Sequence, residues 1–424
     1  MAYAPRIGTL FSIIVVALLA LAGCTSSDSP SSHTATVPLG VSGGPNVIKI
    51  VSSMPRSGSD KGQTDSIVRG FVMALEEVNY RIGDLTLVYY DLDDGTPARG
   101  GAWDQAKEAE NAHAAANDPD VVAYLGTFNS GAAKIAIPVL NRVKLAMVSP
   151  ANTWPGLTKP GKGDPTEPDT YYPTGQRNYV RVVPADDLQG AVGAAFAQQL
   201  GVTKVYVLDD TELYGHGIAT IFADTARKLG MAVVGGPEGI DRNAADYRAL
   251  ALKIRNSGAD MVYFGGITAN NAGKLWQDLR SVLGANVVLM GPDGMFDQAF
   301  VDAAGEAALG TYLTFGGVPP SKLTGKGKEF YTAYKEKYQA EPEVYAAYGY
   351  EAAKVVLDAI TRVGRKDREA IRQAILDTKD FDGVLGRWSF DANGDTTLTT
   401  MSVSRITSNK IADAEFVGLI EAPR

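Results

Sequence analysis

The stretch that decides the fold is "VVAYLGTFNSGAAKIAIPVL", which runs from Val121 to Leu140. Its first five residues are apolar and suit a buried strand, and a helix-like stretch follows Gly131. Between them stand small hydroxyl and amide residues, beginning after Gly126. Such a junction can simply cap the helix. It can also hold an anion through its hydroxyls and its free backbone N–H groups.

The same alternation of strand and helix continues along the chain. The helical pattern Thr64–Asn79 places Ile67, Phe71 and Val78 on one face. Alternating strands and helices indicate parallel sheets that are covered on both faces, and ten strands are too many for one comfortable sheet. We therefore predict an α/β fold of two doubly wound parallel-sheet lobes. The expected strands are Val47–Ser52, Leu85–Tyr90, Val121–Leu125, Ala146–Ser149, Val180–Val183, Lys204–Leu208, Met231–Val234, Met261–Phe264, Val287–Met290 and Tyr312–Phe315.

Two stretches interrupt this alternation. Pro155–Asn178 is long, polar and rich in Pro and Gly, which predicts a surface loop, and loops of this length are often functional. Asp382–Ile406 loses the helical period, and its Asn393-Gly394 pair favours a hairpin turn. We therefore expect a β-hairpin-like C-terminal region.

The N-terminus has the pattern of an export signal. In "RIGTLFSIIVVALLALAGC", Arg6 precedes an apolar run that ends at Cys24, the single cysteine. This predicts a signal peptide over residues 1–23. The small residues before Cys24 resemble the lipobox of bacterial lipoproteins, which implies cleavage before Cys24 and lipid attachment to its sulfur. The alternative, a membrane-spanning helix, needs a longer run and a basic stop-transfer cluster. Residues 24–45, rich in Ser, Thr, Pro and Gly, predict a flexible tether.

Charge and motifs exclude several functions. The net charge is −8 and no long basic run occurs, so we expect no nucleic-acid partner. The histidines His33, His113 and His216 are too scattered for a metal site. "GVSGG" (Gly40–Gly44) and "GLTKPGKG" (Gly156–Gly163) lack the strand and helix context of a nucleophile elbow and a phosphate loop. We predict no cofactor, no metal and no enzymatic activity.

Polar residues stand at several expected strand ends. Besides Ser130, the segment "LAMVSPANTWPGLT" places Thr153 after a strand, and in the second half "DDTELYGHG" exposes Tyr214 and "GPDGMF" exposes Asp293. Ligands of open α/β sheets bind at the carboxyl ends of strands. Hydroxyls and helix N-termini suit a carboxylate, and an acid suits an ammonium group, so an α-amino acid fits. The alternative is that Ser130 and Thr153 only cap helices or turns and that Asp293 is a turn residue.

The order of "GTFNSGAAKIAIP", "MVSPANT", "YGHG", "YFGG" and "MGPDG" resembles that of type I periplasmic binding proteins. From Asn46 onward the chain most resembles the leucine/isoleucine/valine-binding group of ABC importers. The resemblance implies two lobes joined by a three-segment hinge, with crossings near Arg181–Pro184, Gly316–Pro319 and Gly383–Arg387. It implies one lobe of residues 46–182 plus 318–386 and a second of residues 183–317 plus 387–424.

The resemblance also implies the ligand contacts. Ser130 meets the ligand carboxylate, Ala151 and Thr153 contact the ligand backbone, Tyr214 packs over the ligand, and Asp293 takes the ammonium group.

Other positions depart from the family or leave two readings open. Asp293 is one methylene shorter than the usual Glu, and Ile267 stands where many members have Tyr, so both alter the pocket. Arg56 either contacts a ligand anion or is solvated. Trp154 either lines the side-chain pocket or packs in the core or loop.

These expectations define a function. The resemblance implies an exported, lipid-anchored, monomeric substrate-binding subunit that closes around a branched-chain or similar aliphatic amino acid and delivers it to an ABC permease. One alternative is a sensing module of the same fold for an amide or another small polar compound. The other is an exported hydrolase, for which the sequence offers no catalytic constellation.

Overall fold

The computed structural model describes Met1 and residues 37–423. The predicted signal peptide, Cys24 and residues 24–36 of the predicted tether lie outside the described residues, apart from Met1. Among the described residues, no helix is both long and apolar enough to cross a membrane.

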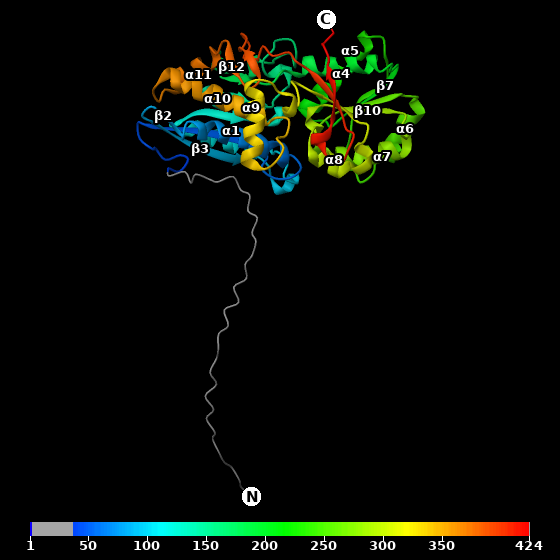
Figure 1. Ribbon diagram of the computed structural model, residues 1–424, viewed down its shortest axis with the longest axis horizontal. Helices are drawn as coiled ribbons and strands as arrows, with labels where there is room; N and C mark the ends of the chain where they lie inside the picture. The colour runs from blue at the N-terminus through cyan, green and yellow to red at the C-terminus, as the bar shows by residue number, and fades with distance from the viewer. Residues whose placement is uncertain (2–36, 424) are drawn as a thin grey trace. The chain divides into compact units, whose positions relative to one another are not determined.

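The first sheet has the strand order β2–β3–β1–β4–β5–β6. All its strands are parallel except the short β2, which pairs antiparallel with β3. Ile50 and Val51 of β1 pack in different hydrophobic clusters, so both faces of the sheet are covered (Figure 1). The strands are β1 Val47–Met54, β2 Arg81–Ile82, β3 Leu85–Asp93, β4 Val121–Gly126, β5 Ala146–Ser149 and β6 Tyr179–Arg181. The covering helices are α2 Gln105–Asn117 and α3 Ser130–Arg142 on one face, and α1 Lys61–Glu77, α10 Ala346–Val363 and α11 Arg368–Leu376 on the other.

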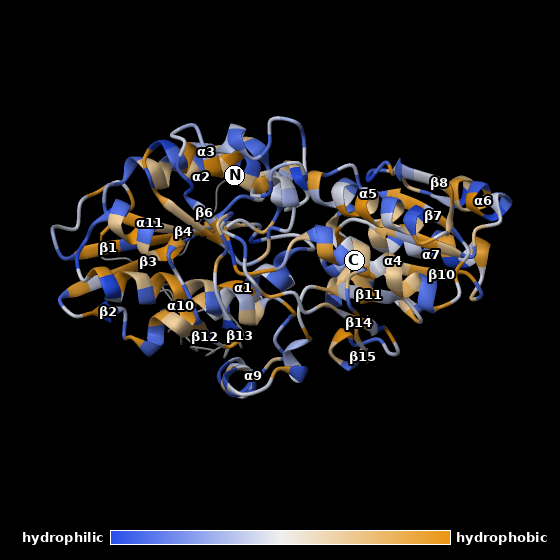
Figure 2. Ribbon diagram, turned by 90° about the horizontal axis from the view of Figure 1, so that it is seen from above, coloured by the Kyte–Doolittle hydropathy of each residue, from blue (hydrophilic) through white to orange (hydrophobic). Residues whose placement is uncertain are grey.

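The second sheet has the order β15–β14–β11–β10–β9–β7–β8, with the C-terminal β14 and β15 added antiparallel at one edge. Val207 and Leu208 of β7 again face opposite sides. In Figure 2 hydrophobic residues gather in the strands of both sheets, whereas the surrounding helices carry many hydrophilic residues. The strands are β7 Lys204–Asp209, β8 Ala232–Gly239, β9 Met261–Gly265, β10 Val288–Gly291, β11 Tyr312–Phe315, β14 Ser402–Arg405 and β15 Glu415–Leu419. The covering helices are α4 Asp186–Gln199 and α5 Leu213–Lys228 on one face, and α6 Arg248–Ser257, α7 Ala272–Leu283 and α8 Gln298–Ala304 on the other.

The predicted fold class, two α/β lobes built on mostly parallel sheets, is confirmed. Several element ends differ by a few residues from the prediction. Val180–Val183 becomes Tyr179–Arg181, and Met231–Val234 lengthens to Ala232–Gly239. Only the first three residues of the edge strand β8 are apolar, and Gly, Pro and Glu residues follow, so the apolar run underestimates the length of the strand.

The chain passes between the sheets three times. The first passage follows β6 and leads to α4, and the second follows β11 and leads to α9 (Lys326–Tyr338). Gly383–Arg387, where the resemblance placed the third, instead belong to a hairpin: residues 384–385 form the turn between β12 (Phe381–Gly383) and β13 (Gly386–Trp388). Glu351 of α10 accepts hydrogen bonds from Trp388 and from the hairpin backbone, which holds the hairpin on the first lobe.

The third passage therefore lies later in the chain than expected. Asp395 still pairs with Arg181 at the edge of the first sheet, and β14 of the second sheet begins at Ser402. The passage thus falls at residues 396–401. The predicted turn at Asn393-Gly394 forms, and it joins the bridged residues Phe390 and Thr396.

Candidate functional site

The last residue of β4, Gly126, is a glycine for a steric reason. Gly126 has φ +149°, and a Cβ there would lie 2.6 Å from the carbonyl oxygen of Ser53 on the neighbouring strand β1. Only glycine fits this position without displacing the backbone. Helix α3 then begins at Ser130, and the side chain of its N-cap residue, Asn129, forms no capping hydrogen bond. The N–H groups of the first turn of α3 are therefore not capped by Asn129, and Asn129 and Ser130 both line the cavity described below.

Hydrogen bonds join this junction to the one after β5. The Asn152 side chain donates to the carbonyl oxygens of Thr127 (2.9 Å) and Phe128 (3.0 Å). The Ser149 hydroxyl accepts from the backbone N–H groups of Ala151 (3.1 Å) and Asn152 (2.8 Å). These bonds fix both loops at the carboxyl edge of the first sheet, as expected for an open α/β sheet.

Ser130 lies where the two loops meet. Its hydroxyl oxygen accepts hydrogen bonds from the backbone N–H groups of Thr153 (3.3 Å) and Trp154 (3.2 Å). Because the Ser130 oxygen already accepts two hydrogen bonds, its O–H group remains available to donate one. Ser130 is the first residue of α3, where the helix dipole and the unpaired N–H groups favour negative charge. This half of the site suits a carboxylate.

Asp293 occupies the opposing half, on the loop after β10. It is buried, and its carboxylate accepts hydrogen bonds from Gln189, from Tyr214 (2.8 Å) and from Tyr345. Burial raises the pKa of Asp293, and the bonds from Tyr345, Tyr214 and Gln189 act in the opposite direction. Three donors thus favour the ionised form of a carboxylate that burial disfavours.

A second acid, Asp186, was not predicted from the sequence. It is the first residue of α4, is fully buried, and its backbone N–H donates to the Thr153 carbonyl (2.9 Å). Neither carboxylate oxygen of Asp186, nor the hydroxyl of Thr153, has a hydrogen-bond partner of normal geometry among the described residues. Burial raises the pKa of Asp186 well above its usual range, and repulsion by Asp293 raises it further.

All six main predicted site residues line one cavity between the lobes, together with four residues that the sequence analysis did not name. The cavity measures about 20 Å³. A single water molecule needs about 10–15 Å³ by this kind of measure, so a larger ligand enters only when side chains or lobes move apart. The lining residues are Phe128, Asn129, Ser130, Ala151, Thr153, Tyr214, Ile267, Asp293, Gly294 and Tyr345.

The two less certain predictions lie outside this cavity. Arg56 forms ion pairs with Asp65 (2.8 Å) and Asp91 (2.9 Å), so its charge is engaged within the first lobe. Trp154 donates through Nε1 to Glu167 (2.9 Å). Its ring closely approaches Gly217 of α5, where a Cβ would lie 2.3 Å away, so Trp154 packs between the loop and the second lobe.

Contacts across the cleft hold the lobes together. Gln63 of α1 donates to the carbonyl oxygens of Asp293 and Phe296, both at 3.2 Å. Arg99 and Glu212 form an ion pair at 3.2 Å. With the bond from Tyr345 to Asp293, these contacts describe a closed arrangement. Within residues 37–423, the cleft included, no group of three or more His, Cys, Asp or Glu side chains is placed to hold a metal ion.

Comparisons with known proteins agree with this architecture. A family model described as "Periplasmic binding protein" matches residues 47–410. A leucine-, isoleucine-, valine-, threonine- and alanine-binding protein from Pseudomonas aeruginosa is 27% identical over 355 residues, covering 82% of this chain and 87% of the relative.

Solved structures show the same fold. The branched-chain amino acid transporter substrate-binding protein of Streptococcus pneumoniae, in complex with isoleucine, is 26% identical with a TM-score of 0.74, and the match covers 88% of this chain and 99% of that one. A more distant ABC transporter solute-binding protein from R. palustris, in complex with benzoate, is 17% identical with a TM-score of 0.72, covering 89% and 97%. At that identity the likeness concerns the fold alone.

Proposed function

The chain belongs to the periplasmic binding protein family, and on this premise we propose that it is the substrate-binding subunit of an ABC importer. Its relatives include a leucine-, isoleucine-, valine-, threonine- and alanine-binding protein and the substrate-binding protein of a branched-chain amino acid transporter. The proposed ligand is an α-amino acid with a branched or similar aliphatic side chain, held between the two lobes.

The observation that carries this proposal is the buried acid Asp293 in the cavity wall, together with a second buried acid, Asp186, which does not itself line the cavity but repels Asp293. A buried carboxylate without a partner is costly, and it is stabilised either by taking up a proton or by pairing with a cation. Neither carboxylate oxygen of Asp186 has a hydrogen-bond partner of normal geometry among the described residues, and the attraction of Thr153 and Arg181 is weaker than the effects of burial and of repulsion by Asp293 combined. An ammonium group placed between Asp186 and Asp293 would relieve both costs.

The opposite end of the cavity supports a carboxylate. Ser130 keeps its O–H as a donor, and the N-terminus of α3 adds backbone N–H groups and a favourable dipole. Donors at one end and acids at the other match a zwitterion in a single orientation.

The aromatic and aliphatic residues that line the rest of the cavity suit a ligand with an apolar side chain. Phe128, Tyr345, Ile267 and Tyr214 are buried and line the cavity. Tyr345 packs edge-to-face against Phe128, with ring centroids 6.2 Å apart, and Tyr214 packs with Ile267 in one hydrophobic cluster. A charged ligand side chain would meet mainly ring and aliphatic carbon here, which favours aliphatic ligands.

Closure of the lobes would complete the site. Residues 182–185, 316–319 and 396–401 connect the lobes and would absorb the rotation, a motion for which periplasmic binding proteins are a known example. The ligand would favour the closed state through contacts that it makes only there.

We further propose that residues 46–182 and 318–396 form one lobe and the rest the second, and that residues 1–23 direct export. Cys24 would carry a lipid that anchors the protein at the outer face of the cytoplasmic membrane or in the periplasm, as a monomer that docks on a permease.

The test is a thermal-shift screen of the chain from residue 24 with Cys24→Ser, which removes the lipid acceptor. The ligands are the twenty amino acids, urea, simple amides and benzoate. Binding to the folded state alone adds about 4 kcal/mol at ~1,000 times Kd, so a true ligand gives a clear shift. Shifts with leucine, isoleucine or valine support the proposal. A shift with benzoate or amides only would retain the binding-protein role and refute the amino acid.

A further inference from the structure

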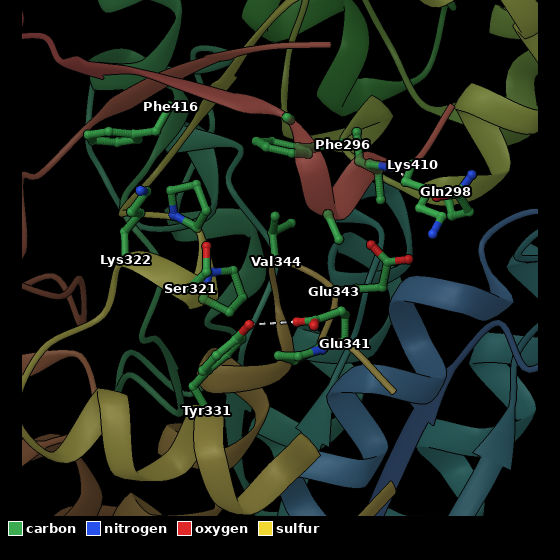
Figure 3. A pocket seen from close by; sticks show the side chains of 16 residues that line it. Phe296, Gln298, Ser321, Lys322, Tyr331, Glu341, Glu343, Val344, Lys410 and Phe416 are labelled. Carbon is green, nitrogen blue, oxygen red and sulfur yellow. Dashed lines mark hydrogen bonds between the residues drawn. The ribbon is translucent and has the colours of Figure 1, made fainter. Parts of the chain in front are cut away.

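A second, larger cavity lies beside the cleft site. Its volume is about 290 Å³, and both lobes contribute to it. Tyr331 of α9 and Val344 come from the first lobe, and Phe296, Ile411 and Phe416 come from the second (Figure 3). Ligand cavities for small organic molecules begin at roughly 300 Å³, so this space suits one small molecule.

The interior of this cavity is apolar. Phe296, Val344 and Ile411 are buried and line it, and Phe416 is partly buried at one end. Figure 3 shows Val344 in the middle of the space, with Phe296 and Phe416 above it. An aliphatic or aromatic body would remove this surface from water, which is favourable in proportion to the apolar area covered.

The rim carries positive charge that the protein does not neutralise. Lys322 and Lys410 are exposed and form no ion pair with any described residue, although Lys322 lies over the ring of Phe416 at 5.8 Å. Glu341 is already engaged, because it pairs with Lys335 and accepts a hydrogen bond from Tyr331 (2.7 Å).

The remaining acid at this cavity, Glu343, does not supply the missing negative charge. Burial and the nearby Asp297 raise the pKa of Glu343 to about 8, which disfavours its charged form near neutral pH. The two lysines therefore determine the sign of the charge at the rim.

We propose that this cavity is a second ligand site, which takes a small organic anion with an apolar or aromatic body. The body lies between Phe296, Val344 and Phe416, and the anionic group faces one of the two lysines, Lys322 or Lys410, which lie at opposite ends of the cavity in Figure 3. Such a molecule would contact both lobes at once.

The two cavities share a wall. Val344 and Phe296 line the second cavity, whereas Tyr345 and Asp293 line the cleft site and are hydrogen-bonded to each other. A ligand that touches both lobes stabilises the closed arrangement. If the proposed function holds, the anion and the amino acid therefore raise each other's affinity by the same factor.

The test uses 8-anilinonaphthalene-1-sulfonate, an aromatic anion that fluoresces when it leaves water, titrated into the chain from residue 24 with Cys24→Ser. We expect saturable binding of one molecule. The double variant Lys322→Glu/Lys410→Glu should weaken it at least tenfold, whereas Lys328→Glu, an exposed lysine of α9 that does not line the cavity, should leave it unchanged. Ala412→Trp, at an exposed lining position, should abolish binding by filling the space.

A second pair of probes separates charge from hydrophobicity. 4-Phenylbutyrate should compete with the fluorescent anion, and 4-phenylbutylamine should not. Equal binding to the double variant, equal competition by the amine, or no saturable binding at all would overturn the second site. These readouts need no amino acid, so they stand or fail independently of the proposed function. Circular dichroism of each variant verifies that it is folded.

Discussion

The two halves of the cleft site are built from opposite kinds of polar group. The first-lobe half offers donors, namely the Ser130 hydroxyl and the N-terminus of α3. The second-lobe half offers an acceptor, the carboxylate of Asp293, and a second buried acid, Asp186, lies near it without lining the cavity. The first half is stabilised by hydrogen bonds within its own loops, whereas the second contains an acid, Asp186, with no hydrogen-bond partner of normal geometry among the described residues.

This difference shows what each half can do by itself. The donor half keeps its shape without a ligand, because Asn152 and Ser149 satisfy its loops. The acid half is electrostatically incomplete, because two buried carboxylates repel each other. We infer that the first half positions the ligand and that the second supplies most of the discrimination.

The largest effect is expected at Asp186. Asp186→Asn should weaken amino acid binding by about 100-fold or more, because truncating one side of a buried ion pair costs roughly 3–5 kcal/mol. The ligand-free protein should keep or gain stability, because Asn has nearly the same size as Asp and cannot ionise, so no second charge can form beside Asp293. Calorimetric titration and thermal melting measure the two quantities.

Asp187→Asn is the matched control for this prediction. Asp187 follows Asp186 on α4 but is partly exposed and pairs with Lys159 at 2.7 Å. Its variant should bind normally. Loss of stability together with loss of binding in Asp186→Asn would instead make Asp186 a structural residue.

A smaller effect is expected at Ser130. Ser130→Ala removes the donor to the ligand carboxylate, and a hydrogen bond to a charged group contributes about 1.5–3 kcal/mol, so affinity should fall roughly 10- to 100-fold. An affinity equal to that of the unmodified protein would show that Ser130 only caps its helix. Ser281→Ala, in α7 away from the cleft, serves as the control.

Tyr345→Phe should have a modest effect. It keeps the ring against Phe128 and Phe315 but removes the hydrogen bond that crosses the cleft to Asp293. Affinity should fall about fivefold, in line with a net contribution of roughly 1 kcal/mol. Small-angle X-ray scattering should show a larger open fraction at subsaturating ligand. An unchanged affinity and unchanged scattering would mean that the bond does not contribute to closure.

The smallest effect on binding is expected at Asp60, which lies outside the cleft cavity, and here the readout is stability. Burial and repulsion by Asp297, Asp210 and Glu212 raise its pKa from 3.8 to about 7. The folded state therefore binds more protons than the unfolded chain between these values, so this group's stabilising contribution is lost as pH rises through about 7.

Asp60→Asn should accordingly match the unmodified protein in stability near pH 4 and exceed it by roughly 1 kcal/mol or more near pH 8. Urea unfolding at both pH values measures the difference. Asp246→Asn is the control, because Asp246 is exposed and its pKa is lowered by Arg248. A gap that is constant with pH would contradict the raised pKa.

Much of the fold could be predicted because strand and helix alternate regularly. The apolar run ending at Gly126 and the glycine at Gly258, which adopts φ +71° after α6, both mark real element ends. The third crossing could not be placed, because Gly383–Arg387 form a hairpin whose position depends on Glu351, more than thirty residues earlier in the chain.

Some cleft residues could likewise be predicted from the sequence and others could not. Ser130, Ala151 and Asp293 follow strands, so the geometry of parallel sheets brings them to one edge. Asp186 follows Pro184 and Ala185 at the start of a helix, where an acid is ordinarily explained by the helix dipole. Its proximity to Asp293 arises because α4 packs beside the loop after β10 within the second lobe, as the hydrogen bond from Gln189 to Asp293 shows. Tyr345 reaches the site from the distant α10 region and has no local signal in the sequence.

The most direct test of the two-ended site is calorimetric titration with leucine and with two analogues that each lack one charged group. 4-Methylpentanoate lacks the ammonium group, and 3-methylbutylamine lacks the carboxylate. Leucine should bind, and each analogue should bind about 100-fold more weakly or worse, because one end of the site is left unpaired. Binding of 4-methylpentanoate as tightly as leucine would contradict the role of Asp186 and Asp293.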